Sequence, residues 1–215
     1  KWVTETDNQA EKSIKKAFYV LIQAGWEAKA RIKKEAKDRE SRYLADYKKQ
    51  ETFTARDYAT TLIATVAKRL ESGRWFVATF WVGDGGMGIY RPAAGEVRVQ
   101  GTPDSGEYGG QTRFLTEDST EVWPQDANKL IARRLRFDVV DSFEAIILMT
   151  DGVSDPKFET DNNLVSIAKW NDLWADLAAA VPFKNRDDSV ADALLVWMDF
   201  WAAGNHDDRT MVVLY

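Results

Sequence analysis

The sequence contains no cysteine and a single histidine, His206, among its 215 residues. The lack of cysteine excludes disulfide bonds, thiolate zinc sites and cysteine nucleophiles. A single histidine also excludes a metal site built from several imidazoles. Any metal ion must therefore be held mainly by oxygen ligands, which favours Mg²⁺, Mn²⁺ or Ca²⁺.

Long apolar runs are missing as well. No stretch reaches the roughly 18 residues required to span a bilayer, and the chain does not open with a signal-peptide pattern. We therefore expect a cytoplasmic protein with no membrane partner. Hydrophobic residues make up 45% of the chain, with 9 Trp and 10 Phe, which is enough for a folded core. We expect one domain over residues 1–215.

Charge is unevenly distributed along the chain. The net charge is -5, yet residues 11–50 hold 12 Lys and Arg against 6 Asp and Glu, so the remainder carries -11. A basic helix on an acidic body suits an anionic partner. However, acidic residues are interspersed among the basic ones at helical spacing, as in Glu35 with Arg39. Aromatic residues that could stack on bases are not interspersed in this way. A solvated helix face is therefore favoured over nucleic-acid binding, with a docking partner on the 11–50 helix as the alternative.

The hydrophobic pattern predicts an α+β fold of antiparallel strands with flanking helices. We expect residues 8–50 to be helical, as two helices or as one that bends, with Gly25 as a weak point. The later helical patterns are 163–180 and a last helix that Asp188 or Ser189 can cap. In that last helix the predicted buried stripe consists of Leu194, Leu195, Met198 and Trp201.

Branched and aromatic residues predict the strands. Four of them, at 59–67, 75–82, 89–91 and 96–99, follow one another through short turns and are typical of an antiparallel meander. Further strands are predicted near 137–141, at 144–150 and at 210–215.

Gly83, Gly85 and Gly88 formally fit a dinucleotide-binding fingerprint. That motif requires the glycine turn to open a helix, whose N-terminus meets the pyrophosphate. Here a strand-like segment, 89–91, and a proline follow instead. A tight hairpin with glycines at positive φ is the favoured interpretation.

Two acidic turns border strongly apolar, strand-like runs. The first, 151–155, follows the run 145–150, and the second, 205–210, precedes the run 211–215. Strands that deliver carboxylates at their tips can hold a hard divalent cation. Each turn alone is weak, because Asp-Gly is a common turn dipeptide and paired acids are often solvated. Neither turn fits an EF-hand calcium loop.

Four motifs occur in the order seen in metal-dependent protein phosphatases of the PP2C type. Residues 55–215 resemble this family, and the resemblance is to its short, stand-alone bacterial branch. The family's motifs are a Thr-Thr-Leu strand, a Gly-Asp-Ser-Arg turn, an Asp-Gly-x-x-Asp turn and an Asp-Asn-x-Thr/Ser turn. This chain has Thr60-Thr61-Leu62, Gly83-Asp84, Asp151-Gly152-Val153-Ser154-Asp155 and Asp207-Asp208-Arg209-Thr210.

The resemblance implies a sandwich of two antiparallel β-sheets flanked by α-helices. It also implies a phosphorylated protein substrate and hydrolysis of phosphoserine or phosphothreonine by a water activated by two Mn²⁺ or Mg²⁺ ions, with a third ion in some members. No catalytic residue is expected beyond the metal ligands. The implied ligands are Asp151 and Asp207, with Asp118 as the candidate for a third ion. The implied supporting residues are Asp155, Asp84, Gly152 and Asp208.

The chain departs from the family pattern in three places. Gly85 and Gly86 replace the Ser-Arg of the second motif, and Asp208 replaces the usual Asn. The early Asp-Gly turn that bridges both metals in the family is missing, so we expect the N-terminal strands to be missing and metal binding to be weak. The alternatives are a pseudophosphatase that serves as an interaction module, or another metal-dependent hydrolase.

Overall fold

The computed structural model describes residues 5–47, 57–101, 103–104, 112–204 and 207–215. Its contacts divide the chain into two compact units, one of residues 1–83 and 104–140 and the other of residues 84–103 and 141–215. Each unit contains one antiparallel sheet together with helices. The predicted α+β class is confirmed, while the single domain over 1–215 stays a prediction.

The first unit contains a three-stranded antiparallel sheet with the order β1-β2-β5. One long helix and one short helix belong to the same unit as this sheet. The elements are α1 (Glu5–Tyr47), β1 (Leu62–Arg69), β2 (Trp75–Val82), α2 (Ala127–Arg134) and β5 (Leu135–Val140). The core of the unit joins the apolar face of α1 to aromatic residues of β2, with Phe76 and Phe80 almost fully buried.

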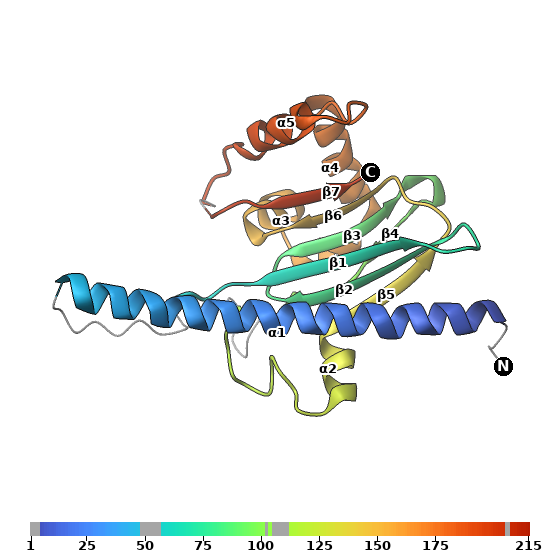
Figure 1. The fold of residues 1–215 in the computed structure, drawn as a ribbon. Helices are drawn as coiled ribbons and strands as arrows, with labels where there is room; N and C mark the ends of the chain where they lie inside the picture. Colours follow the sequence, from blue (N-terminus) through green and yellow to red (C-terminus); the bar gives the residue numbers. More distant parts are fainter. Residues whose placement is uncertain (1–4, 48–56, 102, 105–111, 205–206) are drawn as a thin grey trace. The chain divides into compact units, whose positions relative to one another are not determined.

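Helix α1 is one uninterrupted helix, as Figure 1 shows, and Gly25 does not interrupt it. A Cβ on Gly25 would lie 2.9 Å from the Phe80 ring and 3.2 Å from Trp123. Glycine therefore lets the helix approach the sheet closely, a tertiary reason that a helix-propensity argument cannot detect. Among the described residues, no helix is long and apolar enough to cross a membrane.

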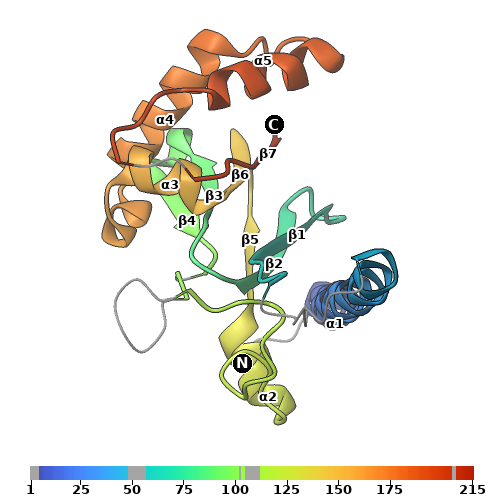
Figure 2. The same ribbon diagram turned by 90° about the vertical axis from the view of Figure 1, so that its left-hand side faces the viewer.

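The second unit contains a four-stranded antiparallel sheet with the order β4-β3-β6-β7. Its strands are β3 (Gly86–Arg91), β4 (Glu96–Val99), β6 (Ala145–Met149) and β7 (Met211–Leu214). Its helices are α3 (Asp151–Phe158), α4 (Ile167–Ala180) and α5 (Asp188–Met198), with short 3₁₀ turns at Pro92–Ala94 and Asp161–Val165. Figure 2 shows α4 and α5 on one side of this sheet, where Trp170, Leu173 and Leu177 of α4 are buried.

The predicted four-strand meander is wrong, because β2 and β3 belong to different sheets. Residues 83–85 connect the two sheets instead of closing a hairpin, and of the three motif glycines only Gly83 has positive φ, at 114°. A Cβ on Gly88 would lie 2.5 Å from the Trp170 ring. Close packing of α4 on β3, and neither a hairpin nor a nucleotide, accounts for that glycine.

The buried stripe predicted for the last helix is only partly right. Leu194 and Met198 pack against the core, but Leu195 is 64% exposed and Trp201 is 81% exposed. Helix α5 ends at Met198, so Trp201 does not continue its helical face. The cap of this helix lies one or two residues earlier than predicted, because the Asp187 carboxylate, and not Asp188 or Ser189, accepts a hydrogen bond from the Ser189 amide.

Candidate active site

The two acidic segments meet at one end of the second sheet. Strands β6 and β7 are antiparallel neighbours, and Met149, the last residue of β6, pairs with Met211, the first residue of β7. In an antiparallel pair the end of one strand faces the beginning of the other. The segments 150–155 and 207–210 therefore lie side by side.

Hydrogen bonds between two threonines lock this junction. The Thr150 amide donates to the Thr210 carbonyl at 3.0 Å, and the Thr210 amide donates to the Thr150 hydroxyl oxygen at 3.0 Å. The same hydroxyl donates to the Asp208 carbonyl at 3.1 Å. Thr150 thus fixes the backbone that carries both Asp151 and Asp208.

The first acidic segment is the first half of a helix and not only a turn. Thr150 is the N-cap of α3, and Asp151 is its first residue. A carboxylate in the first turn is favoured by the positive end of the helix dipole. The Asp151 carboxylate also accepts a hydrogen bond from the Gly152 amide at 2.8 Å, which limits the rotation of that side chain. Gly152 and Pro156 are poor helix formers, so the sequence pattern does not predict α3.

Gly152 is required by a close approach of backbone. A Cβ at this position would lie 2.4 Å from the Asp208 carbonyl oxygen and 3.1 Å from the Asp207 carbonyl oxygen. Backbone atoms cannot rotate away as a side-chain tip can. Gly152 therefore lets the two acidic segments touch, and its supporting role in a metal site stays a prediction.

Arg209 is a positioning residue that the sequence analysis did not single out. Its guanidinium donates to the Gly152 carbonyl at 3.1 Å and to the carbonyls of Met198 and Phe200. It also lies 4.0 Å from the centre of the Phe200 ring. Arg209 therefore ties the beginning of α3 to the end of α5. The sequence signal that could have identified Arg209 is its position between the acidic pair, Asp207 and Asp208, and the final strand.

Five carboxylates are close enough for electrostatic effects to link them. Burial raises the pKa of Asp151, and the negative charges of Asp84 and Asp207 raise it further. Burial also raises the pKa of Asp155, followed by the charges of Asp151, Asp84, Asp161 and Asp207. In the part of the chain that the structure describes, no Lys or Arg forms an ion pair with Asp151 or Asp155.

Asp118 has a different environment in the first unit. Its carboxylate forms ion pairs with the Lys29 ammonium at 3.0 Å and with the Lys33 ammonium at 2.5 Å, and its side chain is 76% exposed. The hydrogen bonds from Lys33 and Lys29 hold the pKa of Asp118 below its usual value. Its role as a ligand of a third ion stays a prediction, and His206 lies outside the described residues.

The described residues contain no group of three or more His, Cys, Asp or Glu side chains that is already arranged to hold a metal ion. What the arrangement provides is local negative charge, carboxylate oxygens on a rigid junction and a helix N-terminus at the same place.

Comparison with known proteins assigns the family. The family described as protein phosphatase 2C matches residues 3–196, which is most of the chain and includes Asp84, Asp118, Asp151 and Asp155. Asp207 and Asp208 lie outside the matched range, so the family match does not bear on their predicted roles in a metal site, which depend on the geometry of the junction. A search of curated proteins found no match. The family match and the two antiparallel sheets agree, and the chain belongs to the protein phosphatase 2C family.

Proposed function

We propose that this chain hydrolyses phosphoserine and phosphothreonine esters of proteins with two Mn²⁺ or Mg²⁺ ions, and that Asp151 and Asp207 are the main protein ligands. Family membership supplies the reaction class. The observation that carries the residue assignment is the junction of β6 and β7, which brings the two aspartates together.

The side chains at this junction fit a hard divalent cation. Carboxylate oxygens are preferred ligands of Mg²⁺ and Mn²⁺, and the mutual repulsion within the cluster is relieved by positive charge. Mg²⁺ commonly binds through one or two carboxylates and completes its shell with waters and substrate phosphates. A partial ligand set made of Asp151 and Asp207 therefore agrees with this mode of binding.

The ions, when bound, would activate a water molecule and neutralise the phosphoryl oxygens. The residues of the chain hold this arrangement in place. Asp151 is fixed by the α3 N-terminus and by its hydrogen bond with the Gly152 amide. Arg209 holds the two acidic segments together, and Asp155 lies one helical turn after Asp151, where it can order a water molecule.

Two further assignments are part of this proposal. Asp84 supports the site mainly through the fold, in the connection between β2 and β3. A third-ion role for Asp118 requires its ion pairs with Lys29 and Lys33 to open.

The test is phosphate release from a phosphothreonine peptide and from p-nitrophenyl phosphate, measured with increasing Mn²⁺ or Mg²⁺ and with EDTA. We expect turnover that depends on the metal and stops with EDTA. No turnover at any Mn²⁺ concentration, with the fold intact by circular dichroism, would contradict the enzyme assignment. Faster hydrolysis of a phosphodiester or an amide would assign another class of metal-dependent hydrolase.

The second candidate is a pseudophosphatase that binds a partner through α1. The observation that favours it is the absence, within the described residues, of a preformed group of three metal-ligating side chains. The exposed lysines of α1 would supply the docking surface. Under this reading the folded protein lacks Mn²⁺-dependent turnover, and its binding to an acidic partner weakens as salt increases.

A further inference from the structure

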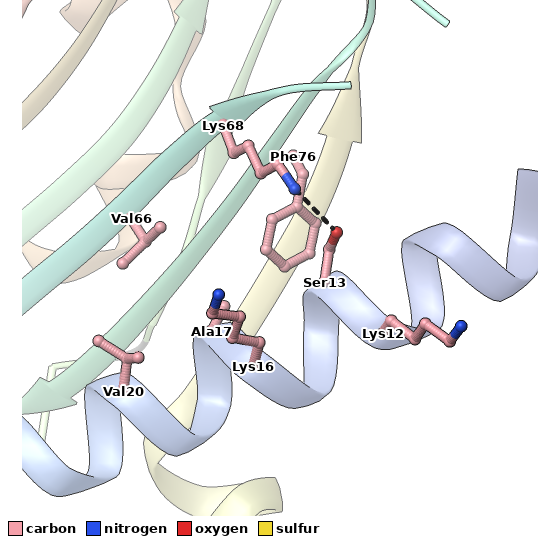
Figure 3. Close-up of a pocket in the computed structure, with 8 residues that line it drawn as sticks. All are labelled: Lys12, Ser13, Lys16, Ala17, Val20, Val66, Lys68 and Phe76. Atoms are coloured by element: carbon pink, nitrogen blue, oxygen red, sulfur yellow. Dashed lines mark hydrogen bonds between the residues drawn. The ribbon is translucent and has the colours of Figure 1, made fainter. Parts of the chain in front are cut away.

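A groove lies between α1 and the hairpin of β1 and β2, within the first compact unit. Its volume is about 410 Å³. Helix α1 contributes one face of residues spaced at helical intervals, and the two strands contribute the opposite side, as Figure 3 shows. The lining residues are Lys12, Ser13, Lys16, Ala17, Val20, Val66, Lys68 and Phe76.

The floor of the groove is apolar. Phe76 is 1% exposed, and it lies directly opposite Lys68 in the register of β1 and β2. Val66 is two residues before Lys68 and therefore points to the same face of the sheet. From α1, the short side chain of Ala17 is buried, and Val20 remains 46% exposed beside the groove. The hollow is therefore lined by apolar surface from both the helix and the sheet.

The rim of the groove is positively charged. Lys12, Lys16 and Lys68 line it and are exposed, and no acidic side chain is among the described residues that line it. The Lys68 ammonium donates a hydrogen bond to the Ser13 hydroxyl at 3.4 Å, which holds this cation between the strand and the helix (Figure 3).

We propose that this groove is a binding site for a small amphipathic anion, with an apolar chain or ring and one carboxylate, sulfate or phosphate head group. The apolar floor would receive the body of the ligand, and the lysines would contact its head group. The volume falls in the usual range of small-molecule sites, and such sites combine apolar walls with a few charged groups. A merely solvated lysine face would have no hollow with Phe76 at its base.

The groove is built only from residues of the first unit and the acidic junction from residues of the second, and the ligand of the groove needs no metal ion. Its test therefore uses binding alone, without divalent cations and without a phosphatase assay. Failure of the ligand to bind would leave the proposed phosphatase activity untouched.

The probe is sodium octanoate, titrated into the whole chain and followed by calorimetry and by amide chemical shifts in NMR spectra. Octanol and octyltrimethylammonium serve as neutral and cationic analogues. We expect octanoate to shift the amides of residues 12–20 and 66–76. We expect octanol to bind about tenfold more weakly, because it lacks the ion pairs with the lysines.

Variants separate the two halves of the site. Changing Lys12, Lys16 and Lys68 together to Gln should weaken octanoate binding about tenfold, since three exposed ion pairs of ordinary strength amount to that factor. The matched control changes Lys34, Lys37 and Lys129 to Gln, which removes the same charge away from the groove. Val20→Gln should weaken octanoate and octanol alike, and circular dichroism checks that each variant is folded.

Four results would overturn the proposal. They are equal affinity for octanol and octanoate, chemical-shift changes outside the groove, equal loss in the control triple variant, and no octanoate binding. Groove binding by an acidic peptide but not by octanoate would assign the surface to a protein partner instead.

Discussion

Asp118 and Asp151 carry the same side chain in the two compact units, and their surroundings move their pKa values in opposite directions. Asp118 accepts hydrogen bonds from Lys33 and Lys29, which lower its pKa. Asp151 is partly buried beside the charges of Asp84 and Asp207, which raise its pKa. The comparison separates an acid whose charge is compensated by two lysines from an acid whose pKa is raised by burial and by neighbouring carboxylates.

The first prediction tests the acids of the second unit. Asp151→Asn and Asp207→Asn should each weaken Mn²⁺ binding at least about a hundredfold, because each removes an anionic oxygen ligand. Calorimetric titration with Mn²⁺ measures the effect, and Asp192→Asn on the exposed side of α5 is the matched control. Asp84→Asn should act mainly on folding. Equal metal affinity in the three junction variants would contradict the assignment.

The second prediction concerns the contact that joins the two acidic segments. Gly152→Ala should destabilise the protein by about 1–3 kcal/mol, because its Cβ would lie 2.4 Å from the Asp208 carbonyl oxygen. Urea denaturation measures the loss. A comparable variant is Gly25→Ala in the first unit, where the nearest atom is the tip of the Phe80 ring at 2.9 Å. Unchanged stability of Gly152→Ala would mean that the segments separate at little cost.

The third prediction uses a buried hydroxyl of the second unit to probe its stability against pH. Tyr90 is buried, its hydroxyl donates to Asn171 at 2.8 Å, and burial raises its pKa, with the charge of Glu144 adding to the shift. The folded state favours the neutral hydroxyl. The stability that Tyr90 contributes is therefore complete below its pKa of about 10 in the unfolded chain, and it is lost as the pH rises through the higher pKa of the folded protein.

Thermal denaturation between pH 8 and pH 11 measures this dependence. Tyr90→Phe should lose about 1 kcal/mol at pH 8, because the hydrogen bond is removed, and should fall less steeply above pH 10. An equally steep fall in the variant would show that other groups cause the alkaline loss.

The smallest effect is expected at Asp118. Asp118→Asn removes ion pairs with Lys29 and Lys33, but the carboxylate is 76% exposed, so solvent screens the interaction and the loss should be at most about 1 kcal/mol. Urea denaturation without metal checks this. A larger loss would mean that the pairs hold the 112–123 segment on α1. A loss of Mn²⁺ affinity, instead, would support the third-ion role.

Strands and helices with local sequence patterns could be predicted from the sequence. The apolar runs predicted β2, β6 and β7, and the predicted caps of α5, Asp188 or Ser189, lie one and two residues after the observed cap, Asp187. Helix α3 was not predicted, because it contains helix-breaking residues. Gly152 is tolerated there because a residue without a Cβ is needed beside the Asp208 carbonyl. The separation of β2 and β3 into different sheets was not predicted either, because a short connection does not reveal whether the two strands it joins pair with each other.

The acidic residues, the oxygen-ligand chemistry and the order of the four motifs are properties of the sequence alone. The composition excludes thiolate ligands and sites of several imidazoles. Motifs made of neighbouring residues can be recognised without knowledge of the fold. Only the tertiary structure decided that Asp151 and Asp207 meet while Asp118 pairs with lysines. Contacts between residues more than fifty positions apart depend on strand pairing and packing, and β6 must pair with β7 before Thr150, Gly152 and Arg209 can join the two segments.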